Sequence, residues 1–229
     1  TGGGFGFVIN RATVQFDDVT VTRLAADEVL LEEDFSGGSI PAGWTTVLGN
    51  WSVVDGRLHG TTGDPRARIA FGPEAPANFR IDTTVRLVSV LNSSRWLNVG
   101  VDYHAGADWG AVVVARSATT ASNGLELAQA AQGGSYASSP VGAAPVALGT
   151  GADHLLSIEV HGSELVVSID GRVSMTATNL KRTGGAFGFV INNSTVQFDN
   201  VRITKLADRP AEPTPPSVPQ QLHLSEDGD

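Results

Sequence analysis

Short runs in which apolar and polar residues alternate at every second position recur along most of the chain. The clearest run covers residues 79–87. Its alternating sets are Phe79, Ile81, Thr83, Val85 and Leu87 on one face, and Arg80, Asp82, Thr84 and Arg86 on the other. Alternation at period two is typical of a strand that is buried on one face and solvated on the other. No segment of useful length shows helical periodicity, so the pattern predicts an all-β protein.

Turn residues separate these runs at near-regular spacing. Asp55-Gly56 and Asp170-Gly171 are tight-turn dipeptides, because glycine accepts a positive φ without a Cβ clash. Many short strands with turns between them indicate a two-sheet antiparallel β-sandwich or jelly roll. Residues 131–152 are rich in small side chains and predict a surface loop with at most one strand. Strands are expected at residues 29–35, 44–47, 50–59, 67–71, 79–87, 96–104, 109–116, 125–130, 154–161, 164–169, 172–176 and 183–206.

One stretch of sequence occurs twice. Residues 183–206 read TGGAFGFVINNSTVQFDNVRITKL, and residues 1–24 read TGGGFGFVINRATVQFDDVTVTRL. Aligned over residues 1–25 and 183–207, the copies differ at seven positions (4, 11, 12, 18, 20, 21 and 23), so 18 of 25 residues are identical. Each copy predicts a Gly-rich turn followed by two strands joined as a β-hairpin. A duplicated unit of this kind is the mark of a tandem array.

The repeat and a Pro-rich tail suggest three parts. We expect residues 1–25 to be the closing hairpin of a preceding tandem repeat, and residues 26–208 to be one complete β-sandwich domain. Residues 209–229 are rich in proline and acidic residues and predict a linker to a following module. The exposed strand edges of residues 1–25 could pair with the domain's own sheet or with a neighbouring molecule, so strand-mediated self-association through this segment is one of two expectations.

Composition narrows the functional classes. Lys and Arg number 15 against 24 Asp and Glu, giving a net charge of −9, which disfavours a nucleic-acid-binding surface. The chain has no cysteine, which excludes disulfides and a thiol nucleophile. It also has no apolar run long enough to predict a membrane span. These observations favour a globular protein that binds neither nucleic acid nor membrane.

The alternation in residues 96–104 suggests a ligand-binding face. Leu97, Val99, Val101 and Tyr103 are expected to point inward, and Gly100, among polar neighbours, is expected to leave floor space for a ligand. Aromatic and bidentate polar side chains on an exposed sheet suit sugars, whose ring faces stack and whose hydroxyls need hydrogen-bond partners. The candidate ligand-binding residues are Arg80, Asp82, Trp96, Asn98, Asp102, His104, Trp109 and Arg116.

A plainer interpretation stays open for these residues. Alternating polar side chains are the ordinary solvent face of any half-buried sheet. Trp44 and Trp51 are expected in the core, and Tyr136 is either a sugar contact in a loop or without a role.

Several motifs together resemble a known superfamily. They are DFSG, GNWSVVDGRLHG, FRIDTTVRL, VDYH, HLLSIEVHGSELVVSIDG and GGAFGFVINNSTVQFDNVRITKL. Over residues 29–207 the chain resembles concanavalin A-like, laminin-G-like jelly-roll domains. Within that superfamily it is similar to the 3-keto-disaccharide hydrolase-like group and to the levan-binding type of carbohydrate-binding module in bacterial polysaccharide-active enzymes. These motifs specify turns and core positions, so they bear on fold more than on chemistry.

The resemblance also implies a structural calcium ion between the first and last strands. The matching positions are Glu33, Asp34 and Asp199, all with the hard oxygen donors that calcium prefers. The alternative is that these acids cap turns or lie on the surface.

We therefore expect a non-catalytic module, secreted or displayed at a bacterial cell surface, that binds a polysaccharide or oligosaccharide and adjoins other modules of its polypeptide. One alternative is a catalytic jelly roll related to glycoside hydrolases, with Asp82, Asp102 and Glu126 as the available acids. The E-x-D-x-x-E run of laminarinase-type glucanases is absent. The other alternative is an adhesin or spacer domain of a tandem array.

Overall fold

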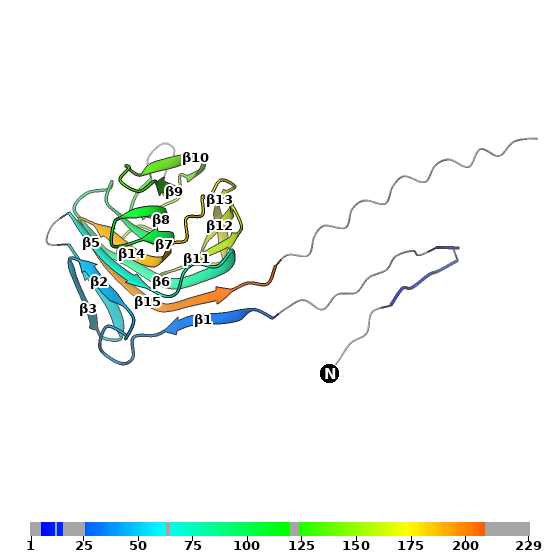
Figure 1. Ribbon diagram of the computed structural model, residues 1–229, viewed down its shortest axis with the longest axis horizontal. Helices are drawn as coiled ribbons and strands as arrows, with labels where there is room; N and C mark the ends of the chain where they lie inside the picture. The colour runs from blue at the N-terminus through cyan, green and yellow to red at the C-terminus, as the bar shows by residue number, and fades with distance from the viewer. Residues whose placement is uncertain (1–5, 12, 16–25, 63–64, 120–123, 209–229) are drawn as a thin grey trace, which may run out of the picture. The chain divides into compact units, whose positions relative to one another are not determined.

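The computed structural model describes residues 6–11, 13–15, 26–62, 65–119 and 124–208 (Figure 1). The described residues between 26 and 208 belong to one compact unit. The described residues contain strands and turns but no helix. Accordingly, no helix in the described ranges is long and apolar enough to cross a membrane.

Two antiparallel sheets make up the compact unit. The first has the order β13-β12-β11-β6-β15-β4-β3, with β1 also paired to β15. Its strands are β1 (Glu28–Glu33), β3 (Asn50–Val54), β4 (Arg57–Thr61), β6 (Asn78–Val90), β11 (His154–His161), β12 (Glu164–Ile169), β13 (Arg172–Ala177) and β15 (Ser194–Lys205).

The second sheet has the order β10-β9-β8-β7-β14-β5-β2. Its strands are β2 (Thr45–Leu48), β5 (Arg66–Phe71), β7 (Trp96–His104), β8 (Trp109–Arg116), β9 (Leu125–Ala130), β10 (Ala137–Ala144) and β14 (Ala186–Asn192). The predicted two-sheet antiparallel β-sandwich is confirmed. The strand expected within residues 131–152 is β10, paired with β9.

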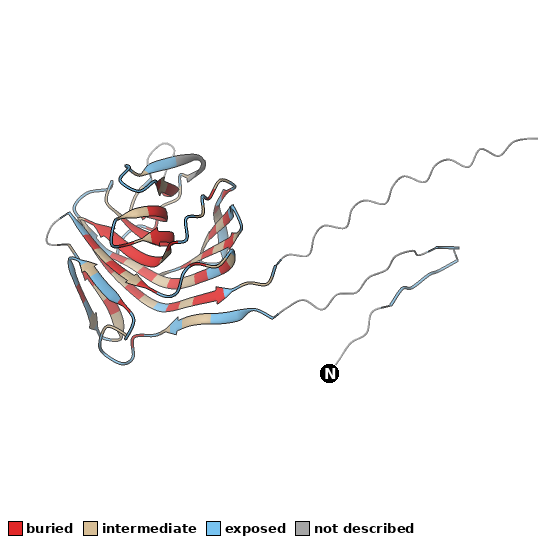
Figure 2. Ribbon diagram, in the orientation of Figure 1, coloured by how far each residue is buried: buried red, intermediate tan, exposed pale blue. Residues whose placement is uncertain are grey.

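The core lies between the two sheets, and Figure 2 shows the buried positions alternating along the strands. The predicted inward face of β6 is buried throughout, Thr83 included. Trp44 stacks on Phe71 with ring centroids 4.0 Å apart. Trp44 and Trp51 are each 9% exposed, so the expectation that they belong to the core is confirmed.

The closing segment does not form the expected hairpin. β14 pairs with β5 and β7 in one sheet, whereas β15 pairs with β1, β4 and β6 in the other. Asn193, with φ 43°, lies at the turn where the chain passes between the sheets. The two strand positions were predicted correctly, but the assumption that neighbouring strands pair was wrong. Across the core, Phe189 of β14 stacks on Phe198 of β15 with centroids 3.8 Å apart.

The N-terminal copy of this segment is described only in part. Residues 6–11 and 13–15 carry no strand, and Phe7 and Val8 are 62% and 98% exposed. The rest of residues 1–25 and all of residues 209–229 lie outside the described residues. The assignments of these segments to a preceding repeat and a linker therefore stay predictions.

A register shift in β7 reverses two predicted side-chain directions. Between Gly100 and Asp102 the pairing with β8 slips by one residue, so Val101 is the extra residue of a β-bulge. As a result Tyr103 packs with Val112 on the outer face of the sheet rather than in the core. Asp102, which was expected to face solvent as a ligand-binding residue, is instead fully buried. Period-two alternation gives the wrong face beyond such a bulge.

Asp102 holds the segment that leads into β14. Its carboxylate accepts hydrogen bonds from Nε of Arg182 at 2.8 Å, from the backbone N–H groups of Thr183 and Gly185 at 3.0 Å, and from the Thr183 hydroxyl. Burial alone would raise the pKa of Asp102. The hydrogen bonds from Thr183, Arg182 and Gly185 outweigh burial and lower it.

We predict that Asp102→Asn lowers the free energy of unfolding by about 2–3 kcal/mol near neutral pH, because Arg182 loses a buried ionised partner. The folded-state pKa of Asp102 is lowered, so its contribution is present above the unfolded-state pKa and is lost as the pH falls through the folded-state value. The difference between wild type and variant should therefore shrink in acid. Urea denaturation at neutral and acidic pH measures this. Asp55→Asn, at an exposed turn, is the control, and a deficit that is constant with pH would contradict the prediction.

Candidate functional site

A pocket of about 240 Å³ lies on the outer face of the seven-stranded sheet, over β7, β8 and β9. Val112, Val114 and Ala128 line it and are buried, so part of its surface is apolar. Asn98, which pairs with Val114 across the strands, is 5% exposed. Its Oδ1 has no hydrogen-bond partner in the ranges that the structure describes. A buried acceptor without a donor is unusual in a finished core, which makes this atom a candidate for ligand contact.

Arg116 and Glu126 form one side of this pocket. Nη2 of Arg116 lies 2.5 Å from Oε1 of Glu126, and the Ser138 hydroxyl donates to Oε2 at 2.6 Å. The pair forms because antiparallel pairing places the end of β8 beside the start of β9. Nη1 of Arg116 is buried and has no acceptor among the described residues.

A second arginine–carboxylate pair also lines the pocket. Asp108, in the turn between β7 and β8, accepts a hydrogen bond from Nη1 of Arg66 at 2.6 Å and from the Tyr103 hydroxyl at 2.8 Å. Arg68 lies 3.9 Å from the same carboxylate. Burial, and then Asp108, raise the pKa values of both Tyr103 and Tyr136 well above their ordinary value. Both phenols therefore remain protonated and can donate hydrogen bonds.

The structure brings together three of the eight candidate ligand-binding residues. Trp96, Asn98 and Arg116 all line the pocket. Gly100 does not provide floor space, because a Cβ at this position would lie 2.6 Å from the Cβ of Tyr103. The bulge in β7 places the Tyr103 ring over this glycine.

The other candidate residues lie elsewhere. Arg80 and Asp82 are on β6 in the opposite sheet, where they pair with each other at 2.8 Å, so the eight residues do not share one face. His104 and Trp109 stack on one another with centroids 3.8 Å apart, and neither lines the pocket. Asp102 is buried beneath the segment before β14.

Sequence reasoning did not select Arg66, Asp108 or Ser138 for this site. Arg66 and Arg68 alternate with Ala67 and Ile69, which is a recognisable half-polar strand. The position of this strand, β5, depends on its pairing with β14, which the sequence does not specify. Asp108 lies in the β7–β8 turn, and the Tyr103 hydroxyl, which donates to its carboxylate at 2.8 Å, holds it at the site.

The three candidate calcium ligands do not form one donor set. Oε1 of Glu33 accepts the Phe35 N–H at 2.6 Å, and Oδ1 of Asp34 accepts the Ser36 N–H at 2.9 Å. The Asp199 carboxylate lies 3.8 Å from Nε of Arg57. Across the described residues there is no group of three or more His, Cys, Asp or Glu side chains arranged to hold a metal. Glu33 and Asp34 instead line a separate depression of about 500 Å³ beside β1 and β15.

Solved structures with this architecture include several carbohydrate-binding proteins. The carbohydrate-binding module CBM66 from Bacillus subtilis has 17% sequence identity and a TM-score of 0.59, covering 69% of this chain and 93% of its own. The VIP36 exoplasmic/lumenal domain, in a Ca²⁺/Man3GlcNAc-bound form, has 10% identity and a TM-score of 0.63, covering 79% and 90%. Bacillus licheniformis β-glucanase has 13% identity and a TM-score of 0.54, covering 77% and 98%. At these identities the likeness establishes the shared jelly-roll fold.

Sequence comparison gives a narrower result. Among curated proteins, no sequence matches this chain. The sequence model of the 3-keto-alpha-glucoside-1,2-lyase-like domain matches residues 31–204, which is well over half of the chain. The resemblance inferred from the motifs is therefore confirmed, and the chain belongs to the 3-keto-alpha-glucoside-1,2-lyase-like domain family.

Proposed function

We propose that the pocket over β7, β8 and β9 binds one sugar residue of a polysaccharide or oligosaccharide. The observation that carries this proposal is the combination of an apolar surface with two arginine–carboxylate pairs, Arg116–Glu126 and Arg66–Asp108, in one small pocket. A sugar ring has the matching chemistry, with C–H groups on its faces and hydroxyls around its edge. Arginine and carboxylate groups each offer two parallel hydrogen bonds to neighbouring hydroxyls.

The size of the pocket supports a single residue as the bound unit. At about 240 Å³ it is smaller than the roughly 300–1,000 Å³ typical of sites for drug-sized ligands. A longer glycan would therefore place one residue in the pocket and run onward over the sheet. Tyr136 adds an aromatic ring and a hydroxyl beside Trp96, both suited to a ligand that is apolar on one side and polar on the other.

The similar structures agree with this proposal at the level of fold. CBM66 is described as a carbohydrate-binding module, and the VIP36 domain was solved with Man3GlcNAc bound. By analogy, we place this domain as a non-catalytic recognition module of a secreted, multimodular bacterial enzyme that acts on polysaccharides. Neighbouring modules of that polypeptide would be its partners.

Catalysis is the second candidate function, because the name of the family refers to a 3-keto-α-glucoside lyase. Such an elimination needs a base for the proton beside the keto group and an acid for the leaving oxygen. The pocket has two carboxylates, but Glu126 accepts bonds from Arg116 and Ser138, and Asp108 accepts bonds from Arg66 and Tyr103. Carboxylates held by several donors are suited to positioning a ligand, which favours binding without turnover.

We predict that Arg116→Gln lowers the affinity for the bound glycan about tenfold to a hundredfold, because a charge-assisted hydrogen bond to the sugar is lost. Calorimetric titration with a glycan selected on an array measures the affinity. Arg86→Gln is the matched control, because Arg86 also pairs with a carboxylate, at 2.7 Å, but on the other sheet. If Arg116→Gln fails to fold, Tyr136→Phe removes a single hydroxyl from the same pocket. Unchanged affinity in both pocket variants would exclude this pocket as the binding site.

We predict that the wild-type chain releases no cleavage product from the glycan selected on the array or from 3-keto-α-glucosides. Chromatography of the reaction mixture measures product release directly. Turnover that disappears in Glu126→Gln would instead establish the lyase function at this pocket. Absence of both binding and turnover would favour a spacer role in a tandem array.

Structural calcium is a further part of the proposed function. The acidic depression that contains Glu33 and Asp34 offers hard oxygen donors, and the VIP36 structure is a calcium-bound form. Each carboxylate accepts one backbone N–H through one oxygen and keeps its other oxygen available for the ion.

We predict that saturating calcium raises the melting temperature by about 5 °C over the chelator-treated protein, because the ion binds the folded state alone. Differential scanning calorimetry with calcium or with EDTA makes the comparison. Asp34→Asn should abolish the rise, and Asp55→Asn, an acid outside the depression, should retain it. Equal melting temperatures in calcium and EDTA would contradict the proposal.

A further inference from the structure

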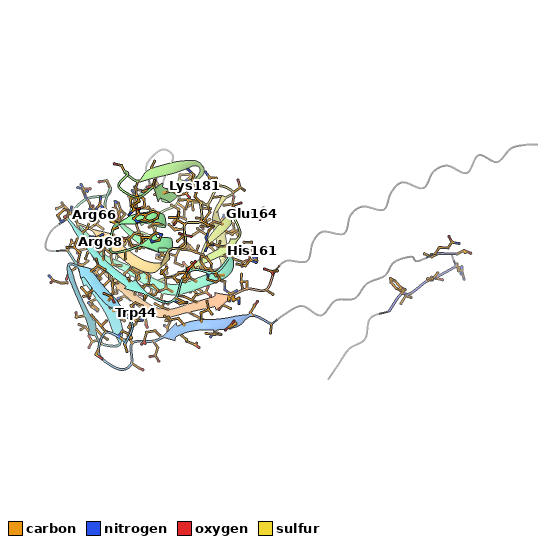
Figure 3. All side chains as sticks on the ribbon, in the orientation of Figure 1. Trp44, Arg66, Arg68, His161, Glu164 and Lys181 are labelled. Carbon is orange, nitrogen blue, oxygen red and sulfur yellow. The ribbon has the colours of Figure 1, made fainter. Side chains whose placement is uncertain are left out.

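The two sides of the pocket differ in charge. Arg116 and Glu126 neutralise one another, whereas Arg66 and Arg68 share the single carboxylate of Asp108. This side of the pocket therefore has a local excess of positive charge, whereas the whole chain carries a net charge of −9. Figure 3 labels Arg66 and Arg68, which lie on β5 at the same side of the domain.

The same region has more hydrogen-bond donors than acceptors. Nη1 of Arg68 donates to the carbonyl of Ala105 at 2.9 Å, but its Nε is buried without an acceptor among the described residues. The hydroxyl of Tyr136 is also buried without a partner there, and so is Nη1 of Arg116. Of these groups Arg116 and Tyr136 line the sugar pocket and Arg68 does not, and the tyrosine hydroxyl can accept as well as donate. Among the described residues, the buried acceptor of the pocket that lacks a donor is Oδ1 of Asn98. Buried donors are costly to leave unpaired, so a ligand bound beside these arginines is expected to supply mainly acceptors.

A second depression makes the arginines accessible from the other side. It has a volume of about 250 Å³ and is lined by Leu48, Pro65, Arg66, Arg68 and Asp108. Arg66 and Asp108 also line the sugar pocket, so they form a wall between the two spaces. The side chain of Arg66 is 44% exposed, which leaves it free to contact a ligand group at this wall.

We propose that the glycan recognised here is acidic, with a carboxylate or sulfate group bound by Arg66 at the wall between the pocket and the second depression, where Arg68 adds positive charge from the depression side. This inference rests on the proposed function, because it specifies the ligand of the same pocket. An anion supplies acceptors without donors, so it matches both the extra positive charge and the unpaired donors. The hydroxyls of a neutral sugar can hydrogen-bond to both arginine–carboxylate pairs, but they do not balance the extra positive charge of Arg66 and Arg68.

The test is calorimetric titration of the full chain with sugars that differ only in charge. The pairs are methyl glucoside and methyl glucuronide, methyl galactoside and methyl galacturonide, and galactose and galactose 6-sulfate. At least one acidic member should bind about tenfold more tightly than its neutral counterpart, because charge-assisted hydrogen bonds are stronger than neutral ones. The advantage should decrease as ionic strength rises, because salt screens a partly exposed charge pair.

Arg66→Gln should weaken binding of the acidic sugar at least about tenfold more than binding of its neutral counterpart, so that the preference for the acidic sugar is lost. Arg202→Gln is the matched control, because Arg202 is 42% exposed and pairs with Glu32 at 2.8 Å on the opposite sheet. Neutral and acidic sugars that bind equally would overturn this inference and leave the proposed function standing. A preference that persists in Arg66→Gln would also overturn it. Failure of every sugar in the panel to bind would overturn the proposed function itself.

Discussion

The sandwich depends on one segment that supplies a central strand to each sheet. β14 hydrogen-bonds with β5 and β7, and β15 hydrogen-bonds with β4 and β6, so neither sheet is continuous without this segment. The stacked rings of Phe189 and Phe198 join the two strands through the core. On its outer face β14 places Val190 in the apolar cluster beside the pocket. The same segment therefore connects the packing of the core to the shape of the candidate site.

The β7 bulge is the second constraint on the site. By adding Val101 to one strand, it turns Asp102 into the interior, where Arg182, Thr183 and Gly185 compensate its burial. It also turns Tyr103 outward, where its hydroxyl holds Asp108 in reach of Arg66. A regular strand would reverse both side chains and leave Asp108 without this partner. The pocket and the anchor of the β14 segment thus arise from one local irregularity.

The sequence was sufficient for features set by local periodicity. The strand positions and the buried face of β6 follow from alternation alone, because each strand packs one side on the core. Sheet membership did not follow, since Asn193 carries the chain between sheets where a tight turn normally joins partners. The bulge in β7 was not predicted, because it interrupts the alternation of apolar and polar residues from which the side-chain directions were inferred. Arg66, which enters the site through pairing of β5 with β14, depends on contacts over 100 residues away in sequence.

The charge arrangement also fixes how a ligand can lie. Arg116–Glu126 offers donors and acceptors together, so it suits neutral hydroxyls, whereas Arg66 and Arg68 around Asp108 offer mainly donors. An acidic substituent is favoured at the Arg66 end of the pocket, because Arg66 and Arg68 together carry one charge more than Asp108, whereas Arg116 and Glu126 balance one another. The ion pairs hold their side chains in place before binding, which reduces the entropy lost on association. The direction in which a ligand lies and the preorganisation of the pocket therefore depend on the same charged side chains, which are those of Arg66, Arg68, Asp108, Arg116 and Glu126.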